Sequence, residues 1–285
     1  MRTRATVAAV TGVLALSAFA VPAAEAADAP SGKATFSSAS ADAASSAAAD
    51  TLDVTFSNMK VNKGKAIVVG ATAQVTVTAT YTVTHPASLS AGSFDSGPLL
   101  YRGTSVTSPT DLFGGDNPGT CTAASSTVLN CTAKIQFRPA SSNEDADLAN
   151  GRAGTWKVGA LALGDSDYKW QGDLGTQKVQ RLSKLTVNAS PEPVKKGKTI
   201  TVTGKLTRAN WDTNTYAGYG SQKVVLQFRK AGTTNYTNVK GITSTSTGAL
   251  KTTVTAATDG YYRFTFAGSA TTAPATVAGD YVDVQ

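Results

Sequence analysis

Residues 75–84 read Val-Thr-Val-Thr-Ala-Thr-Tyr-Thr-Val-Thr, and this stretch decides the fold class. Apolar residues alternate with threonine over its whole length, so an extended chain has one apolar and one polar face. This pattern is typical of a strand in an antiparallel sheet with one buried face. Shorter runs of the same kind recur between Gly, Pro and Asn turns, and no segment has sustained helical spacing. The sequence therefore predicts an all-β protein built as sandwiches or barrels.

Composition narrows the classes of protein further. The 285 residues leave room for one or two domains, and they include one histidine and two cysteines, which excludes a histidine cluster or a four-cysteine zinc site. The histidine, His85, follows the strand at 75–84 and is expected to face solvent. A Ser/His/Asp site would have to be built on it, and the sequence has no Gly-x-Ser-x-Gly turn. We therefore predict a non-enzymatic protein.

The first 50 residues predict export followed by a spacer. Arg2 and Arg4 precede an apolar run at 5–21, and the small-residue pattern at 24–26 follows it, as in a secretory signal peptide at 1–26. Residues 27–50 are rich in Ala and Ser without apolar periodicity, so we expect a disordered spacer there. Since no second apolar stretch follows, we predict a secreted protein, extracellular or cell-wall associated, with no membrane span.

The two cysteines are expected to form a structural disulfide. Cys131 lies on the apolar side of an alternating run at 128–137, and a turn near 125–126 places Cys121 opposite it. A bridge is favoured in an exported protein. A reactive thiol pair is the alternative, but the cysteines lack CxxC spacing and basic neighbours.

An internal repeat predicts two domains. The segment VNKGKAIVV at 61–69 recurs as VKKGKTITV at 194–202, and GTWKV at 154–158 has a counterpart in GYYRF at 260–264. Two tandem sandwiches explain both matches. We predict a first sandwich at 51–182, containing the disulfide, and a cationic second sandwich at 183–285. The junction between 178 and 185 has no Gly/Ser/Pro linker, so we expect limited hinge freedom.

Three segments carry a family resemblance: LTVNASPEPVKKGKTITVTGKLTR at 185–208, VLQFRK at 225–230 and DGYYR at 259–263. They resemble a module common in secreted proteins of actinobacteria. The whole chain is similar to a two-domain, Ig-like family of exported proteins that is largely uncharacterised, with some members labelled calcium-binding. The resemblance implies two tandem Ig-like antiparallel β-sandwiches and an extracellular location. It implies no catalytic motif.

Acidic loops suggest calcium as the one candidate cofactor. The first choice is the loop that holds Asp165, Asp167 and Asp173, because calcium prefers several carboxylate and carbonyl oxygens. Two further clusters are Asn143, Glu144, Asp145 and Asp147, and Asp111, Asp116 and Asn117. The first-choice loop begins like an EF-hand but lacks its glycine and terminal glutamate. Solvated turns are the alternative for all three clusters.

Aromatic residues next to glycine mark two loops. Trp211, Tyr216 and Tyr219 lie in a loop of the second predicted sandwich, and Tyr168 and Trp170 lie in one of the first. Exposed rings stack on sugar faces or on peptide side chains, so these loops are candidate ligand-binding platforms. The alternative is that the rings fold back and cap the core.

Charge is distributed unevenly between the two halves. Residues 27–180 carry 11 basic and 13 acidic residues, whereas residues 181–285 carry 13 basic and 5 acidic residues, a net charge of +8. Lys195, Lys196 and Lys198 cluster in one segment and are candidate ligand-binding residues. We expect an anionic cell-wall polymer, a glycan or a protein as partner, and no nucleic acid, because no nucleic-acid motif accompanies the charge. The alternative is that the lysines keep sheet edges soluble.

Overall fold

The computed structural model describes residues 51–139, 148–165 and 167–285. The predicted signal peptide, the predicted spacer and the acidic cluster at 143–147 lie outside the described residues. Within them, no helix is long and apolar enough to cross a membrane.

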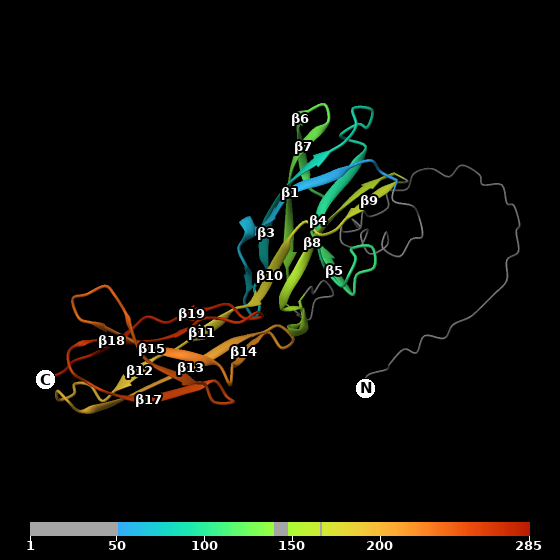
Figure 1. The fold of residues 1–285 in the computed structure, drawn as a ribbon. Coiled ribbons are helices and arrows are strands. Elements are labelled where there is room, and N and C mark those ends of the chain that lie inside the picture. The colour runs from blue at the N-terminus through green and yellow to red at the C-terminus, as the bar shows by residue number, and fades with distance from the viewer. Residues whose placement is uncertain (1–50, 140–147, 166) are drawn as a thin grey trace, which may run out of the picture. The chain divides into compact units, whose positions relative to one another are not determined.

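The first half of the described chain forms two sheets (Figure 1). One sheet has four antiparallel strands in the order β1 (Thr55–Val61), β3 (Val75–Thr84), β7 (Val128–Phe137) and β6 (Thr120–Ser125). The other has the order β2 (Ile67–Val69), β10 (Thr176–Arg181), β8 (Gly154–Gly164), β4 (Phe94–Arg102) and β5 (Asp111–Gly114), with β9 (Tyr168–Gln171) on β8. These sheets form the first sandwich.

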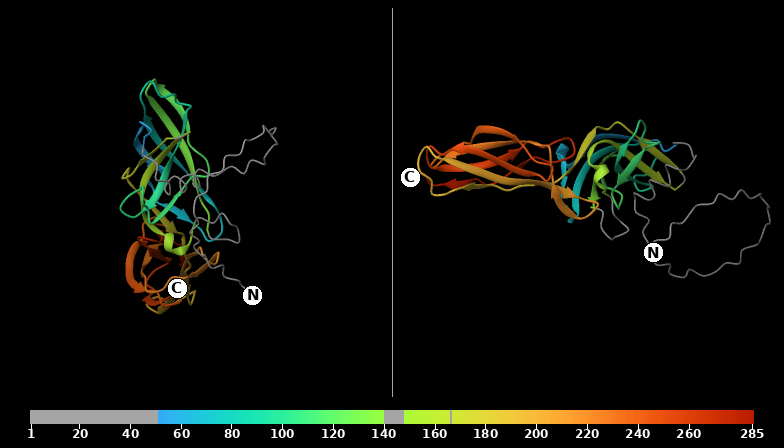
Figure 2. Two further views of the ribbon diagram at one scale, coloured as in Figure 1. Left: turned by 90° about the vertical axis from the view of Figure 1, so that its right-hand side faces the viewer. Right: turned by 90° about the horizontal axis from the view of Figure 1, so that it is seen from below.

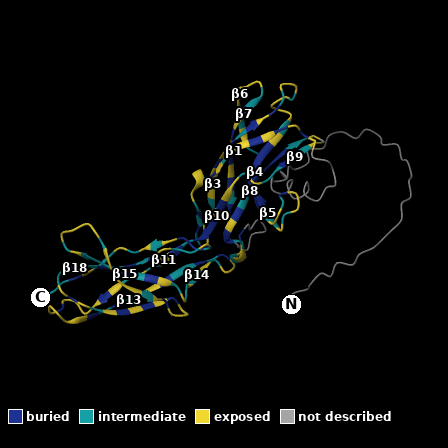
Figure 3. Cartoon of the chain, viewed as in Figure 1, coloured by how far each residue is buried: buried dark blue, intermediate teal, exposed yellow. Residues whose placement is uncertain are grey.

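Strand β3 follows the predicted alternation. Val77, Ala79, Tyr81 and Val83 are buried, while the threonines between them point outward and are mostly exposed. Figure 3 shows the same alternation of buried and exposed residues along many strands. Val77 and Ala79 belong to the same core cluster as Trp156 of β8, which is fully buried and whose ring centroid lies 4.6 Å from that of Phe113, while Tyr81 and Val83 belong to a second core cluster. The alternating pattern thus fixes which face of each strand enters the core.

The second half forms the second sandwich, shown from yellow to red in Figures 1 and 2. Its first sheet is built on the long strand β13 (Thr199–Asn210), which pairs with β11 (Ser183–Leu185), β12 (Asn188–Ser190), β14 (Thr215–Gly218) and β17 (Ala249–Thr255). Its second sheet consists of β16 (Thr237–Thr243), β15 (Lys223–Lys230), β18 (Gly260–Phe266), β19 (Ala275–Thr276) and β20 (Asp280–Val282).

Both sandwiches have an Ig-like strand order. In chain order, β1, β3, β4, β5, β6, β7, β8 and β10 take the places of strands A, B, C, C′, D, E, F and G. In the second sandwich β12, β13 and β17 form the A-B-E sheet, and β16, β15, β18 and β20 form the C′-C-F-G sheet. Each sandwich also has a parallel contact near its end: β2 pairs with β10 in the first, and Val194 forms an isolated bridge with Val284, which follows β20, in the second. The all-β, Ig-like prediction is therefore confirmed.

Of the two repeats found in the sequence, only the shorter one, 154–158 with 260–264, occupies equivalent strands in the two sandwiches. Gly154 begins β8 and Gly260 begins β18, so this pair occupies equivalent strands, with Trp156 and Tyr262 both buried. The longer repeat, 61–69 with 194–202, leads instead into strands that occupy different places in the two sandwiches. The first copy leads into β2, beside the last strand of its sandwich, and the second leads into β13, the centre of its sheet. What the longer copies share is a turn with a left-handed glycine, with φ of 76° at Gly64 and 82° at Gly197.

A single residue, Leu182, connects the two sandwiches: β10 of the first ends at Arg181, and β11 of the second begins at Ser183. Its N–H donates to Val69 O at 2.8 Å, and its carbonyl accepts from Ala209 N at 2.8 Å. The preceding Arg181 is bonded through its backbone to Thr271 and Ala273. The connection therefore has few free backbone groups.

Candidate functional site

The predicted disulfide is present. Cys121 of β6 and Cys131 of β7 lie directly opposite each other in register, with their Cα atoms 4.1 Å apart. Both cysteines of the chain are in this bridge, so it is a structural crosslink between neighbouring strands.

The structure does not bring the first-choice acidic residues together. Asp165 and Asp167 lie in the turn between β8 and β9, whereas Asp173 follows the far end of β9, a strand about 13 Å long. Asp173 accepts a hydrogen bond from Tyr101 Oη at 3.1 Å and pairs with Lys157 Nζ at 3.2 Å. The three carboxylates that were predicted to share one site therefore lie apart in the structure. No group of three or more His, Cys, Asp or Glu side chains in the described ranges is placed to hold a metal ion. Calcium binding elsewhere in the chain stays a prediction.

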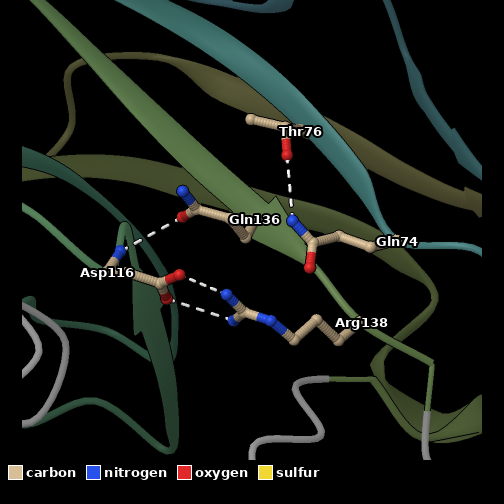
Figure 4. A network of polar contacts seen from close by, with 5 residues as sticks. All are labelled: Gln74, Thr76, Asp116, Gln136 and Arg138. Carbon is tan, nitrogen blue, oxygen red and sulfur yellow. Dashed lines mark hydrogen bonds and ion pairs between the residues drawn. The ribbon is translucent and has the colours of Figure 1, made fainter.

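The acids of another predicted cluster are paired with arginine. Asp111 pairs with Arg152 at 2.8 Å, and Asp116 makes a two-pronged ion pair with Arg138. Figure 4 shows the second pair beside Gln136, whose side chain accepts from Asp116 N at 3.1 Å. These carboxylates hold loops of the first sandwich in place.

His85 is buried, which corrects the expectation that it faces solvent. It is 5% exposed, with Nδ1 3.0 Å from Pro86 O and its ring edge-on to Phe94. Its Nε2 has no hydrogen-bond partner among the described residues. The sequence held the signal for this, because residue 85 continues the inward positions 77, 79, 81 and 83 of β3.

Trp211 also lies in the interior rather than on a ligand platform. Its side chain is 0% exposed, packs with the core of the first sandwich, and donates from Nε1 to Gly70 O at 2.9 Å. Trp170 is buried as well, at 5% exposure. For these two rings the capping alternative is correct, because large aromatics bury the most apolar area when they close a core.

Tyr216 and Tyr219 are half-buried, and each ring carries a cation. Lys184 Nζ lies 3.7 Å from the Tyr216 ring centroid, and Arg208 Cζ lies 4.0 Å from that of Tyr219. The Tyr219 ring also packs edge-on against Phe266. Contacts within the chain therefore cover much of both rings.

The predicted lysines form an exposed turn. Lys195, Lys196 and Lys198 are all exposed and lie between Val194 and β13. The turn is bonded to the residues that follow β20, since Lys196 N donates to Gln285 O at 2.8 Å. Among the described residues, none of the three lysines has an ion pair with a carboxylate side chain.

A further surface was missed by the sequence reasoning. It is the outward face of the C′-C-F-G sheet of the second sandwich, and we call it the Arg–Tyr face; its residues are Gln227, Arg229, Tyr236, Tyr261, Arg263 and Tyr281. Strand register places Arg229 opposite Tyr261 and Tyr261 opposite Tyr281. The alternate positions Phe228, Tyr262 and Val282 pack into the core, so these side chains point to the opposite side.

Stacking and hydrogen bonds order the two guanidinium groups. Arg263 Cζ lies 3.6 Å from the Tyr236 ring centroid, and Arg229 Cζ lies 4.0 Å from that of Tyr261. Arg263 Nε donates to Gln227 Oε1 at 2.9 Å. A side-chain hydrogen bond with Tyr236 raises the pKa of Arg229 above its ordinary value, so this side chain stays charged.

The signal for this surface was only partly present in the sequence. Gln227 and Arg229 are two residues apart, as are Tyr261 and Arg263, so each pair shares one face of its strand. Which strands are neighbours, and which residues lie opposite, depends on long-range pairing that no local pattern contains.

Two shallow hollows lie on the outer face of the four-stranded sheet of the first sandwich. The larger, about 460 Å³, is lined by Asn58, Lys60, Thr80, Tyr81, Thr82, Thr122, Asn130, Cys131 and Thr132. The smaller, about 280 Å³, shares Thr132 with it and extends to Asn117 and Lys134. Neither is lined by a carboxylate or a histidine, so neither offers a general acid–base pair.

Comparisons with known proteins establish no family. No family model and no curated protein matches the chain. Among solved structures, latent PorU from Porphyromonas gingivalis is 12% identical with a TM-score of 0.26, and the match covers 81% of this chain but only 20% of that one. A chimeric titin Z1Z2 tandem is 13% identical with a TM-score of 0.27, over 80% of this chain and 99% of that one. The ICAM-5 D1–D4 fragment is 12% identical with a TM-score of 0.36, over 80% and 47%. These low scores carry no functional argument, and the Ig-like assignment rests on the strand order.

Proposed function

We propose that this protein is a non-enzymatic, extracellular binding protein whose cationic second sandwich binds an anionic polymer of the cell envelope. Export and membership of the actinobacterial Ig-like family are part of this proposal. The predicted signal peptide supports export, and the disulfide suits an oxidising compartment. The observation that carries the binding role is that no basic side chain of the second sandwich forms an ion pair with a carboxylate of the described residues.

Three of the five acids of the second sandwich accept hydrogen bonds from backbone N–H groups. Asp259 accepts from Val284 N at 2.8 Å, and Asp280 accepts from Ala189 N at 2.7 Å. Asp212 accepts from Asn150 N at 2.9 Å. In the described part of the chain, the ion pairs join Arg138, Arg152 and Lys157 to acids of the first sandwich. The basic residues of the second sandwich are thus left to attract an external anion.

The non-enzymatic part of the proposal follows from the placement of the candidate groups. His85 is buried, its Nε2 has no hydrogen-bond partner among the described residues, and the two hollows described above are lined by no carboxylate or histidine. The pKa of Asp173 is lowered mainly by its hydrogen bond with Lys157, which makes this carboxylate a weak base.

Co-sedimentation of the full-length mature chain with purified cell walls tests this function. We expect binding that weakens steadily with added salt. Replacing Lys195, Lys196 and Lys198 with glutamine should reduce the affinity roughly tenfold or more, since each lysine near an anionic surface contributes about 1 kcal/mol. Lys60→Gln with Lys134→Gln, which removes exposed charge from the first sandwich, is the control and should leave binding unchanged. Binding that is insensitive to salt, or lost equally in the control, would contradict the proposal.

A further inference from the structure

We infer that the Arg–Tyr face is a binding site for a polysaccharide whose sugar rings carry carboxylate groups. This inference rests on the proposed function, because it names the chemistry of the anionic polymer and the residues that recognise it.

The side chains form a continuous row across four strands. Tyr236 precedes β16, whose first residue pairs with Phe228, and the row continues through Arg229 of β15, Tyr261 of β18 and Tyr281 of β20. At about 4.8 Å between neighbouring strands, the row extends about 14 Å. This length suits a segment of a linear polymer better than a single small ion.

The two guanidinium groups carry ordered charge that no carboxylate of the described residues neutralises. Arg229 Nη1 donates to the backbone oxygen of Thr233, in addition to its hydrogen bond with Tyr236, and Arg263 donates to Gln227, so these hydrogen bonds go to neutral acceptors. No carboxylate of the described residues forms an ion pair with either arginine. Each guanidinium keeps further N–H donors in a planar fork, which matches a carboxylate with two parallel hydrogen bonds. Stacking on the rings holds the forks in place before a ligand arrives.

The ring faces add a requirement that a simple anion does not meet. Tyr281 is 39% exposed, and its ring lies 5.1 Å from that of Tyr261 at an angle of 55°. An exposed ring of this kind stacks on the apolar face of a sugar. A linear polyphosphate has no such face, and a neutral glycan leaves both guanidinium groups unpaired. A sugar that carries a carboxylate satisfies rings and cations together.

A single-stranded nucleic acid also combines rings with negative charge, but the face suits it less well. Binding of single strands uses successive open aromatic platforms for the bases. Here Arg263 lies over Tyr236 and Arg229 lies over Tyr261, which leaves Tyr281 as the most exposed ring of the row. Binding of a single-stranded nucleic acid is therefore one of the outcomes that would overturn the inference.

The backbone beneath the row is fitted to these side chains. A Cβ atom at Gly279 would collide with Tyr236 Oη and would lie 2.9 Å from Tyr261 Cβ. Glycine at this position lets the chain before β20 pass under both tyrosines. The ring positions are therefore held by neighbouring backbone as well as by the arginines.

The test measures binding of the full chain to three probes: polygalacturonate, inorganic polyphosphate and oligo-dT. For the wild type we expect polygalacturonate to bind more tightly than either other probe at equal salt. Arg229→Gln with Arg263→Gln should weaken polygalacturonate binding about tenfold or more. Tyr281→Ala should weaken it about fivefold and leave polyphosphate binding unchanged.

Two further variants separate geometry from charge. Lys205→Gln with Lys251→Gln removes two exposed charges from the opposite sheet and should change polygalacturonate binding far less than loss of the arginines. Arg229→Lys with Arg263→Lys keeps the charge but loses the planar forks, and should restore only part of the affinity. Unchanged thermal unfolding confirms that each variant folds.

The outcomes distinguish this inference from the function on which it rests. If the wild type binds all the anionic probes equally, or if loss of the arginines has no more effect than loss of Lys205 and Lys251, the inference is overturned while a general polyanion-binding function survives. If the wild type binds none of the anionic probes, both fail.

Discussion

In the first sandwich Asp111 and Asp116 are paired with arginines, whereas in the second Asp259 and Asp280 accept hydrogen bonds from backbone N–H groups. The arginines of the second sandwich stack on tyrosine rings instead, as Arg263 does on Tyr236. Two domains with the same Ig-like strand order thus use charge differently. In the first sandwich, ion pairs between aspartate and arginine hold loops in place. In the second sandwich, the arginines that stack on tyrosine rings remain available to bind an anion.

The largest difference in stability between the two sandwiches is expected on substitution of Trp211. Although Trp211 follows a strand of the second sandwich, its ring packs in the core of the first. Trp211→Ala should reduce the free energy of unfolding by about 3–5 kcal/mol, because it leaves a large cavity. Chemical denaturation with a probe in each sandwich should show that the first loses stability. Destabilisation confined to the second sandwich would contradict the placement of this ring.

The next largest effect is expected at alkaline pH. Burial raises the pKa of Tyr81 from 10.0 to about 12, and its Oη lies 2.9 Å from Ser96 O, to which it donates. A raised folded-state pKa contributes stability that is complete below pH 10 and lost as the pH rises toward 12. The loss should reach about 2–3 kcal/mol. Thermal unfolding from pH 9 to 12 should show this loss in the wild type and a smaller one in Tyr81→Phe; equal profiles would refute the assignment.

The disulfide should affect the first sandwich alone. Its sequence separation is 10, so replacing Cys121 and Cys131 with alanine should cost about 2–3 kcal/mol in the chain-entropy model. Urea denaturation, followed separately in each sandwich, measures this difference. An equal loss in the second sandwich would show that the two unfold as one cooperative unit.

The smallest expected effects compare the acids directly. Asp116→Asn removes a partly exposed ion pair and should cost about 0.5–1 kcal/mol, with the cost falling at high salt. Asp259→Asn keeps an oxygen acceptor for Val284 N, so it should cost less than that and should not depend on salt. A salt-dependent loss of unfolding free energy for Asp259→Asn would contradict the proposed difference between the acids of the two sandwiches.

The sequence predicted the features that depend on local pattern. The alternation in Val75–Thr84 is reproduced by burial, and Cys121 lies opposite Cys131 as expected. The same alternation, carried one step further, also places His85 inward. His85 was expected to be a solvent-facing residue at the strand end, but the inward side of the strand extends as far as this residue.

Features that depend on long-range pairing were not predictable. Asp167 and Asp173 are close in sequence, but an extended strand between them holds them apart. The residues of the Arg–Tyr face show the reverse: Arg229, Tyr261 and Tyr281 are separated in the sequence, but strand register makes them neighbours in space. Local composition correctly located the positive charge in the second half of the chain, but it did not show which cations stack on rings.

The most direct test of this division of roles is the salt dependence of binding to polygalacturonate, measured for three full-length proteins. These are the wild type, Arg229→Gln with Arg263→Gln, and Lys60→Gln with Lys134→Gln. The account predicts that the wild type and the first-sandwich variant bind alike and weaken in parallel as salt rises, while the second-sandwich variant binds about tenfold more weakly at low salt. Equal affinities for all three proteins, or a larger loss in the first-sandwich variant, would contradict it.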